Sequence, residues 1–150
     1  MTLSAADNHP LGQHLVGLDH VVIRARNPER LIAFYRDVIG CPVERTLEEY
    51  GLVQLRAGNG LVDIVDAAGK LGLDGGPPPN GQGINMAHFC LLLDMDEQSL
   101  REHLLRHQVT HGEFAVRYGA TGFGLSTYIK DPEGNSLELK LSDTHHDHTV

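Results

Sequence analysis

Hydrophobic positions in the first half of the chain follow the pattern of a strand, a helix and then three more strands. Residues 18–25 (LDHVVIRA) form a β-rich apolar run. In residues 27–39, apolar side chains recur at i, i+3, i+4, i+7 and i+8, which predicts an amphipathic helix that Asn27 caps and Gly40 ends. Three short strand-like segments follow, CPVERT, LVQLRA and LVDIVDA. The pattern predicts the order β-α-β-β-β.

The same order returns in the second half. MAHFCLLLD predicts a strand, and residues 94–108 predict a helix that begins with a capping box of Asp94 and Glu97. Three further strand-like segments complete this half, EFAVRYG, LSTYIK and NSLELKLS. Between the halves, residues 67–85 are rich in Gly and Pro and have no period, which indicates a linker. Residues 144–150 contain three histidines without periodicity and are predicted to form a flexible tail.

The two halves are interpreted as copies of one unit. His20 and His88 occupy the same place in the first strand of each half, 68 positions apart, and the second helix begins close to the position that this offset gives. A sheet with a helix on one face needs its other face covered, so we expect the two units to pair. The chain, 1–150, is predicted to be a single α+β domain of two βαβββ modules, one at 16–66 and one at 86–143.

Charge and composition exclude several classes of function. The 150 residues carry 12 Lys and Arg against 20 Asp and Glu, a net charge of −8, so nucleic acid and anionic membranes are not expected partners. No apolar run is long enough to span a membrane, and the first residues do not resemble a signal peptide, which favours a cytoplasmic protein. Two cysteines without CxxC spacing argue against a disulfide framework or a thiolate zinc site, and Cys90 is predicted to be a small buried residue.

Four polar residues interrupt otherwise apolar strands at equivalent places in the two halves. His20 and His88 lie near the start of the first predicted strand of each half. Asp63 and Glu138 each lie between two apolar residues of the last predicted strand. Because strand side chains alternate, all four are predicted to project from the face opposite the helices. Two imidazoles with one or two carboxylates, and no thiolate, suit a divalent Ni, Co, Zn, Mn or Fe ion.

Further side chains share this face by strand alternation, namely Arg24, Arg56, Tyr128 and Lys140. They are predicted substrate contacts, suited to a carboxylate or enolate oxygen, and an ion pair at the rim is the competing interpretation for each charge. The sequence has no complete dinucleotide fingerprint and no P-loop lysine, so neither NAD nor ATP is expected.

The strand histidines in LDHVVIRARNPERLIAFYRDVIG and MAHFCLLL, with the glutamate in YIKDPEGNSLELK, resemble the vicinal oxygen chelate superfamily. This superfamily contains glyoxalase I, methylmalonyl-CoA epimerase, extradiol dioxygenases and the fosfomycin and bleomycin resistance proteins. The resemblance covers residues 18–143 and implies an open, cupped barrel of mixed β-sheet with helices on the outside. It also implies that His20, His88 and Glu138 bind a divalent metal in the cup, and it favours a homodimer.

Asp63 departs from the family pattern. Glyoxalase-like members usually have Glu at this place, epimerase-like members have Gln, and the dioxygenases leave the place uncoordinated, while Asp reaches about 1.5 Å less far than Glu. With Asp63 as a ligand, the resemblance implies a glyoxalase I-like isomerase or lyase. Such an enzyme moves a proton next to a carbonyl of a small, metal-chelated substrate, anionic or neutral, with Glu138 and Asp63 as its catalytic carboxylates.

Two alternatives stay open. Without Asp63, the set of His20, His88 and Glu138 has the composition that suits Fe(II) and O₂, as in a ring-cleaving dioxygenase of the extradiol type. The third alternative is a metal-free binding protein of the bleomycin-resistance type, which uses an apolar cleft. The polar residues at all four positions argue against this third alternative.

Overall fold

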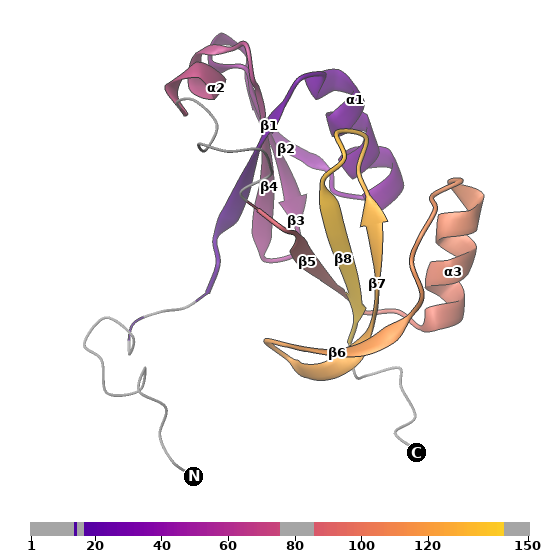
Figure 1. Ribbon diagram of the computed structural model, residues 1–150. Helices are drawn as coiled ribbons and strands as arrows, with labels where there is room; N and C mark the ends of the chain where they lie inside the picture. The colour runs from indigo at the N-terminus through magenta and orange to yellow at the C-terminus, as the bar shows by residue number, and fades with distance from the viewer. Residues whose placement is uncertain (1–13, 15–16, 76–85, 143–150) are drawn as a thin grey trace.

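The two halves of the chain form two four-stranded sheets of the same design (Figure 1). The computed structural model describes residues 14, 17–75 and 86–142. The first sheet has the order β1-β4-β3-β2, with β1 at His20–Ala25, β4 at Gly60–Asp66, β3 at Leu52–Ala57 and β2 at Val43–Leu47. The second has the order β5-β8-β7-β6, with β5 at Phe89–Leu93, β8 at Ser136–Leu141, β7 at Gly122–Lys130 and β6 at Ala115–Gly119.

In both sheets the first strand runs parallel to the last, and the other pairs are antiparallel. The registers repeat as well, because Val22 pairs with Asp63 and Cys90, 68 positions after Val22, pairs with Glu138. Within the described residues no ladder joins the two sheets, so the arrangement is open. The predicted α+β class, with two βαβββ modules in an open arrangement, is confirmed.

The helix of the first module has two parts. It starts as α1 (Pro28–Ala33), where the Asn27 side chain accepts a hydrogen bond from the Arg30 N–H, and continues as the π-helix η3 (Phe34–Ile39). Gly40 ends it with φ 90°, a left-handed conformation that glycine adopts without strain. The predicted cap and stop are confirmed. The prediction of a uniform α-helix is wrong in its second half, where the backbone widens into π-helical turns.

The second helix, α3 (Glu97–Arg106), begins later than predicted. Its N-cap is Asp96, whose carboxylate accepts from the Ser99 N–H at 2.7 Å. The predicted capping box of Asp94 and Glu97 is therefore wrong, because Asp94 lies two residues before the cap and accepts instead from the Ser142 hydroxyl at 3.1 Å. Along the described chain, no helix has the length and apolar character of a membrane span.

Part of the predicted linker is structured. The short helix α2 (Lys70–Asp74) packs against β4 and the 3-10 turn η4 (Glu48–Tyr50), at the end of the first sheet (Figure 1). Gly72 lies so close to the chain that a Cβ there would be 2.1 Å from the Asp66 carbonyl oxygen. The close approach thus requires glycine at position 72, and the five residues of α2 are too few to show an apolar period. The rest of the predicted linker, 76–85, and the predicted tail lie outside the described residues.

Buried side chains from both modules form one hydrophobic core. Figure 1 shows α1 and α3 on the same side of the molecule. The buried residues of α1, η3 and α3 belong to the same cluster as those of β7 and β8, namely Leu31, Tyr35, Leu100, Leu104, Ile129, Leu137, Leu139 and Leu141. The Tyr35 ring stacks on Phe89 of β5 with 6.3 Å between centroids. Cys90, in contrast, is exposed, so the prediction that it is buried is wrong: its side chain leaves the opposite face of β5 from the core residues.

Candidate functional site

Glu138 lies at the centre of a polar network on the second sheet. The residue is 7% exposed, and its Oε1 accepts a hydrogen bond from the Tyr128 hydroxyl at 2.8 Å and lies 3.3 Å from His88 Nε2. Burial by itself raises the pKa of Glu138. Hydrogen bonds from Tyr128, Ser126 and Cys90, together with the charge of His88, outweigh that effect and hold the pKa below its usual value. Glu138 is therefore an ionised carboxylate at neutral pH.

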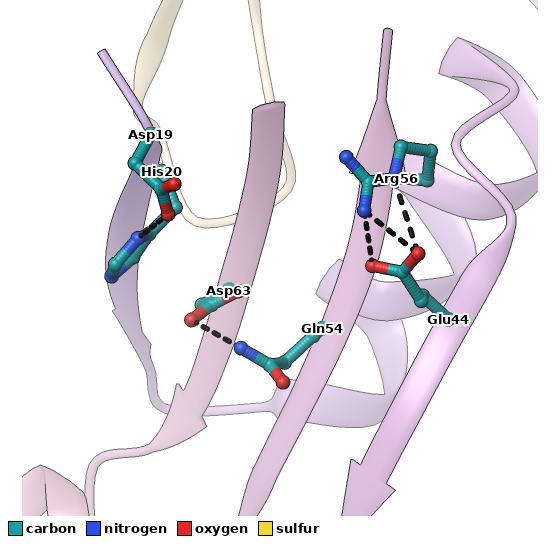
Figure 2. Close-up of polar contacts among 6 residues, drawn as sticks. All are labelled: Asp19, His20, Glu44, Gln54, Arg56 and Asp63. Carbon is teal, nitrogen blue, oxygen red and sulfur yellow. Dashed lines mark hydrogen bonds and ion pairs between the residues drawn. The ribbon is translucent and has the colours of Figure 1, made fainter. Parts of the chain in front are cut away.

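The first sheet carries the second imidazole and the second carboxylate. Figure 2 shows His20 on β1 and Asp63 on the adjacent strand β4, with Gln54 reaching toward Asp63 from β3. Gln54 Nε2 donates to Asp63 Oδ2 at 2.9 Å, and His20 Nδ1 lies 2.6 Å from Asp19 Oδ1. Asp63 is 4% exposed, and its other oxygen, Oδ1, is buried without a hydrogen-bond partner. A buried carboxylate oxygen without a hydrogen-bond partner destabilises the folded protein unless another group binds it.

A pocket of about 570 Å³ brings much of this chemistry together. His20, His88 and Glu138 line it, along with Lys140 and a mainly apolar wall, whereas Asp63 is not part of its lining. Within the described residues no three His, Cys, Asp or Glu side chains are close enough to hold a metal ion. Each module thus contributes one imidazole and one carboxylate, with His88 one residue before β5 and 3.3 Å from Glu138, and three of the four candidates line one pocket.

The residues present fit a divalent metal by their chemistry. The unpartnered Asp63 Oδ1 is an anionic oxygen that lacks the partner a cation would supply. Two imidazoles and two carboxylates form a nitrogen and oxygen donor set suited to transition metals. Tyr128 and Gln54 each bind one carboxylate oxygen, as the outer hydrogen bonds of metal sites do.

The predicted substrate contacts fall into two groups. Lys140 lines the pocket and Tyr128 binds Glu138, so both lie at the site. Arg56 forms an ion pair with Glu44 at 2.7 Å (Figure 2), as the competing interpretation of an ion pair expects. Arg56 is not part of the pocket lining. Arg24 also lies outside the lining and contacts the α2 end near Gly75.

Sequence reasoning missed Arg117 of β6. Its Nη1 donates to the Ser126 carbonyl at 2.7 Å and to the Ser126 hydroxyl at 2.9 Å, and its guanidinium lies 4.8 Å from the centroid of the Tyr128 ring. These contacts support, from the β6 side, two of the three side chains that hydrogen-bond Glu138, namely Ser126 and Tyr128. Alternation along AVRYG was the available signal, since Arg117 is the polar residue between Val116 and Tyr118.

Replacing Asp19 with Asn is expected to lower the pKa of His20 in protein kept free of metal with EDTA. The hydrogen bond to Asp19 is the largest of the effects that raise this pKa above 6.5, followed by the charge of Asp63. A raised pKa means that the folded protein favours the imidazolium, so His20 stays charged to higher pH than a free imidazole. NMR titration of the His20 ring protons measures the change.

The matched control for this titration is Asp37→Asn. Asp37 is an exposed aspartate that pairs with Arg36, and its replacement should leave the His20 pKa unchanged. An Asp19→Asn protein in which His20 titrates as in the wild type would show that the 2.6 Å contact has no effect on the imidazole.

Comparisons with known proteins agree with this architecture. A family model described as the Glyoxalase/Bleomycin resistance protein/Dioxygenase superfamily matches residues 17–139. A virulence protein from Salmonella typhimurium matches with 21% identity and a TM-score of 0.71, over 85% of this chain and 98% of the other. An integron cassette protein from V. cholerae matches with 23% identity and a TM-score of 0.67, over 85% of this chain and 95% of the other. A lactoylglutathione lyase from Agrobacterium tumefaciens matches with 22% identity and a TM-score of 0.61, over 83% and 92%.

Proposed function

Because this chain belongs to the glyoxalase/bleomycin resistance protein/dioxygenase superfamily, we propose that it is a metal-dependent isomerase or lyase of the glyoxalase type. The reaction would move a proton next to a carbonyl of a small substrate. The observation that carries the proposal is Asp63 Oδ1, a buried carboxylate oxygen without a partner, on the sheet that also presents His20. A dioxygenase site needs only the other three residues, so a buried acid at the fourth place favours isomerase or lyase chemistry.

In this proposal His20, Asp63, His88 and Glu138 hold the metal. Bound there, a divalent ion would supply positive charge to two neighbouring substrate oxygens and acidify the adjacent C–H. Glu138 takes that proton and returns it to the neighbouring carbon, for which its lowered pKa keeps it ionised beforehand. Tyr128 donates to Glu138 Oε1 and so orients the carboxylate, while the apolar pocket wall keeps water from the transferred proton.

We also propose that the working form is a homodimer, as is common in the superfamily. Each module offers one imidazole and one carboxylate, and β1 and β5 each leave one edge without a ladder within the described residues. Pairing of two chains along these edges would bring the two pairs of ligands to one ion. The cytoplasmic location stays a prediction from the sequence.

The proposed function is tested with metal-stripped protein to which Ni²⁺, Co²⁺, Zn²⁺, Mn²⁺ or Fe²⁺ is returned. At least one ion is expected to raise the unfolding temperature, since a ligand at 100 times its Kd stabilises a fold by about 2.7 kcal/mol. The same ion should support formation of lactoylglutathione from methylglyoxal and glutathione, the activity named for one structural neighbour. Oxygen uptake with catechol, in place of this reaction, would instead indicate the dioxygenase.

A matched variant separates the two possible ligand sets. Asp63→Ala should lower the affinity for the stabilising ion. Asp74 is an exposed aspartate on α2 that pairs with Lys70, and Asp74→Ala should leave that affinity unchanged. If Asp63→Ala binds the ion as wild type does, only His20, His88 and Glu138 remain as ligands. If no ion stabilises the protein, the proposal fails and the metal-free binding protein is favoured.

A further inference from the structure

The Lys140 side chain is a buried cation at the edge of the pocket. The residue is 3% exposed and lies on β8, two residues after Glu138 and on the same face. Its ammonium donates to the Thr121 hydroxyl at 3.3 Å and to the Gly122 carbonyl. Across the described parts of the chain, no carboxylate forms an ion pair with it. Buried charges are usually paired with a charge of opposite sign, so this ammonium lacks a counter-ion.

Two glycines of the β6–β7 hairpin make room for this side chain. A Cβ on Gly119 would lie 3.1 Å from Lys140 Nζ, and a Cβ on Gly124 would lie 2.9 Å from Lys140 Cε. A larger residue at Gly124 would therefore collide with the lysine stem, and one at Gly119 would crowd the ammonium. The hairpin forms a slot that fixes the stem and brings the ammonium to the turn, so the position of the charge is set before any ligand arrives.

The slot opens on the pocket that holds the proposed catalytic groups. Lys140 lines the pocket together with His20, His88 and Glu138, and the hairpin residues Tyr118–Thr121 line its edge. The rest of the wall is mainly apolar, for example Leu61 and Leu92. In such surroundings, a charge-assisted hydrogen bond is stronger than it is in water.

We infer that Lys140 binds an oxyanion group, a carboxylate or a phosphate, of the substrate that reacts beside Glu138. This inference rests on the proposed function only for the reaction at Glu138. Binding of the anion itself needs the ammonium and the slot, and it does not need the metal. The substrate class is thus a small molecule with a reactive carbonyl at one end and an anionic group at the other.

The test uses folded, metal-free wild-type protein in EDTA at constant ionic strength. Lactate and inorganic phosphate are titrated separately, and the backbone amide signals of Gly119–Gly122 are followed by NMR. At least one probe should give a saturable shift of these signals. Lys140→Met keeps the stem and removes the charge. It should raise the Kd of that probe by at least about tenfold, the value expected for a lost charge-assisted hydrogen bond. The probe that binds identifies the anionic group as carboxylate or phosphate.

Two further variants keep the test decisive. Lys130→Met removes an exposed lysine that binds Ser136 at 2.5 Å, and it should bind the probe within about twofold of wild type, as for a surface change that leaves the slot intact. Lys140→Gln also removes the charge, and its amide can still donate to the Gly122 carbonyl, so it should weaken binding of the probe as Lys140→Met does and covers the case in which Lys140→Met does not fold.

Saturation by neither probe, or equal affinity in wild type and a folded protein without the charge at position 140, would overturn the inference and leave Lys140 with a structural role only, through its hydrogen bonds to the hairpin. The metal experiment fails independently of this one. Anion binding without metal-dependent turnover would remove the glyoxalase-type proposal and keep the anion site. Turnover without anion binding would do the reverse.

Discussion

Replacing Glu138 with Gln is expected to reduce the metal-dependent turnover by about 10²-fold to 10⁴-fold, the range that general acid–base groups contribute. Glutamine keeps the size of the side chain, and its amide oxygen can accept the hydrogen bond that the Tyr128 hydroxyl now gives to Oε1. The negative charge and the proton acceptor are lost. The rate of lactoylglutathione formation by the metal-loaded variant measures the effect, and urea unfolding reports whether the fold survives.

Glu113→Gln is the matched control for this variant. Glu113 is exposed in the segment before β6, so the same chemical change there should leave turnover and stability unchanged. A Glu138→Gln protein that stays folded and keeps more than about a tenth of the wild-type rate would exclude Glu138 as the base. The search for the proton acceptor would then move to Asp63, the other carboxylate of the proposed site.

Asp131→Ala is expected to lower the free energy of unfolding by about 3 kcal/mol. The buried Tyr35 hydroxyl loses a charged acceptor, and the other hydrogen bonds to this carboxylate are lost with it. Asp131 is 4% exposed and accepts from the Tyr35 hydroxyl at 2.8 Å, from the Glu133 and Asn135 N–H groups at 2.9 Å, and from the Asn135 amide at 2.8 Å. Tyr35 is fully buried, so its hydroxyl would have no replacement partner from bulk water. Urea unfolding followed by circular dichroism gives the value.

The control for this stability prediction is Asp37→Ala. Asp37 pairs with Arg36 on the surface, where both side chains are about half exposed, and its loss should cost less than about 0.5 kcal/mol. Tyr35→Phe, which removes the hydroxyl and leaves Asp131 its other bonds, should cost about 1 kcal/mol. Equal unfolding midpoints for Asp131→Ala and wild type would show that the turn is stable without this carboxylate.

Much of the fold follows from local pattern. Each predicted strand is present, because alternation and β-branched runs are properties of a few neighbouring residues, and Gly40 stops its helix where a left-handed conformation is needed. Helix α2 was missed because its five residues are too few to show an apolar period, and Gly72, which the close approach of Asp66 requires, is typical of a linker. The role of Asp131 in the core could not be predicted, because its bond to Tyr35 joins residues 96 positions apart.

In the candidate site too, local sequence patterns predict some features, whereas contacts between residues far apart in the sequence are not predicted. Alternation placed Asp63 and Glu138 on the face opposite their apolar neighbours, and the pairing of each carboxylate with the equivalent residue of the first strand follows from the repeat. Their partners Gln54 and Tyr128 depend on strand register, which the sequence does not specify. How far one sheet stands from the other depends on packing across the whole core. The sequence therefore predicts the types of ligand but not their distances.

The core that both modules share has a consequence for how the chain folds. Tyr35 of the first module stacks on Phe89 and bonds to Asp131 of the second, and His103 Nε2 lies 2.6 Å from the Val38 carbonyl across the same boundary. Neither module is therefore expected to fold on its own. Unfolding should be cooperative over the whole chain, and an exchange of either copy for one from a distant relative would require matching substitutions in the other.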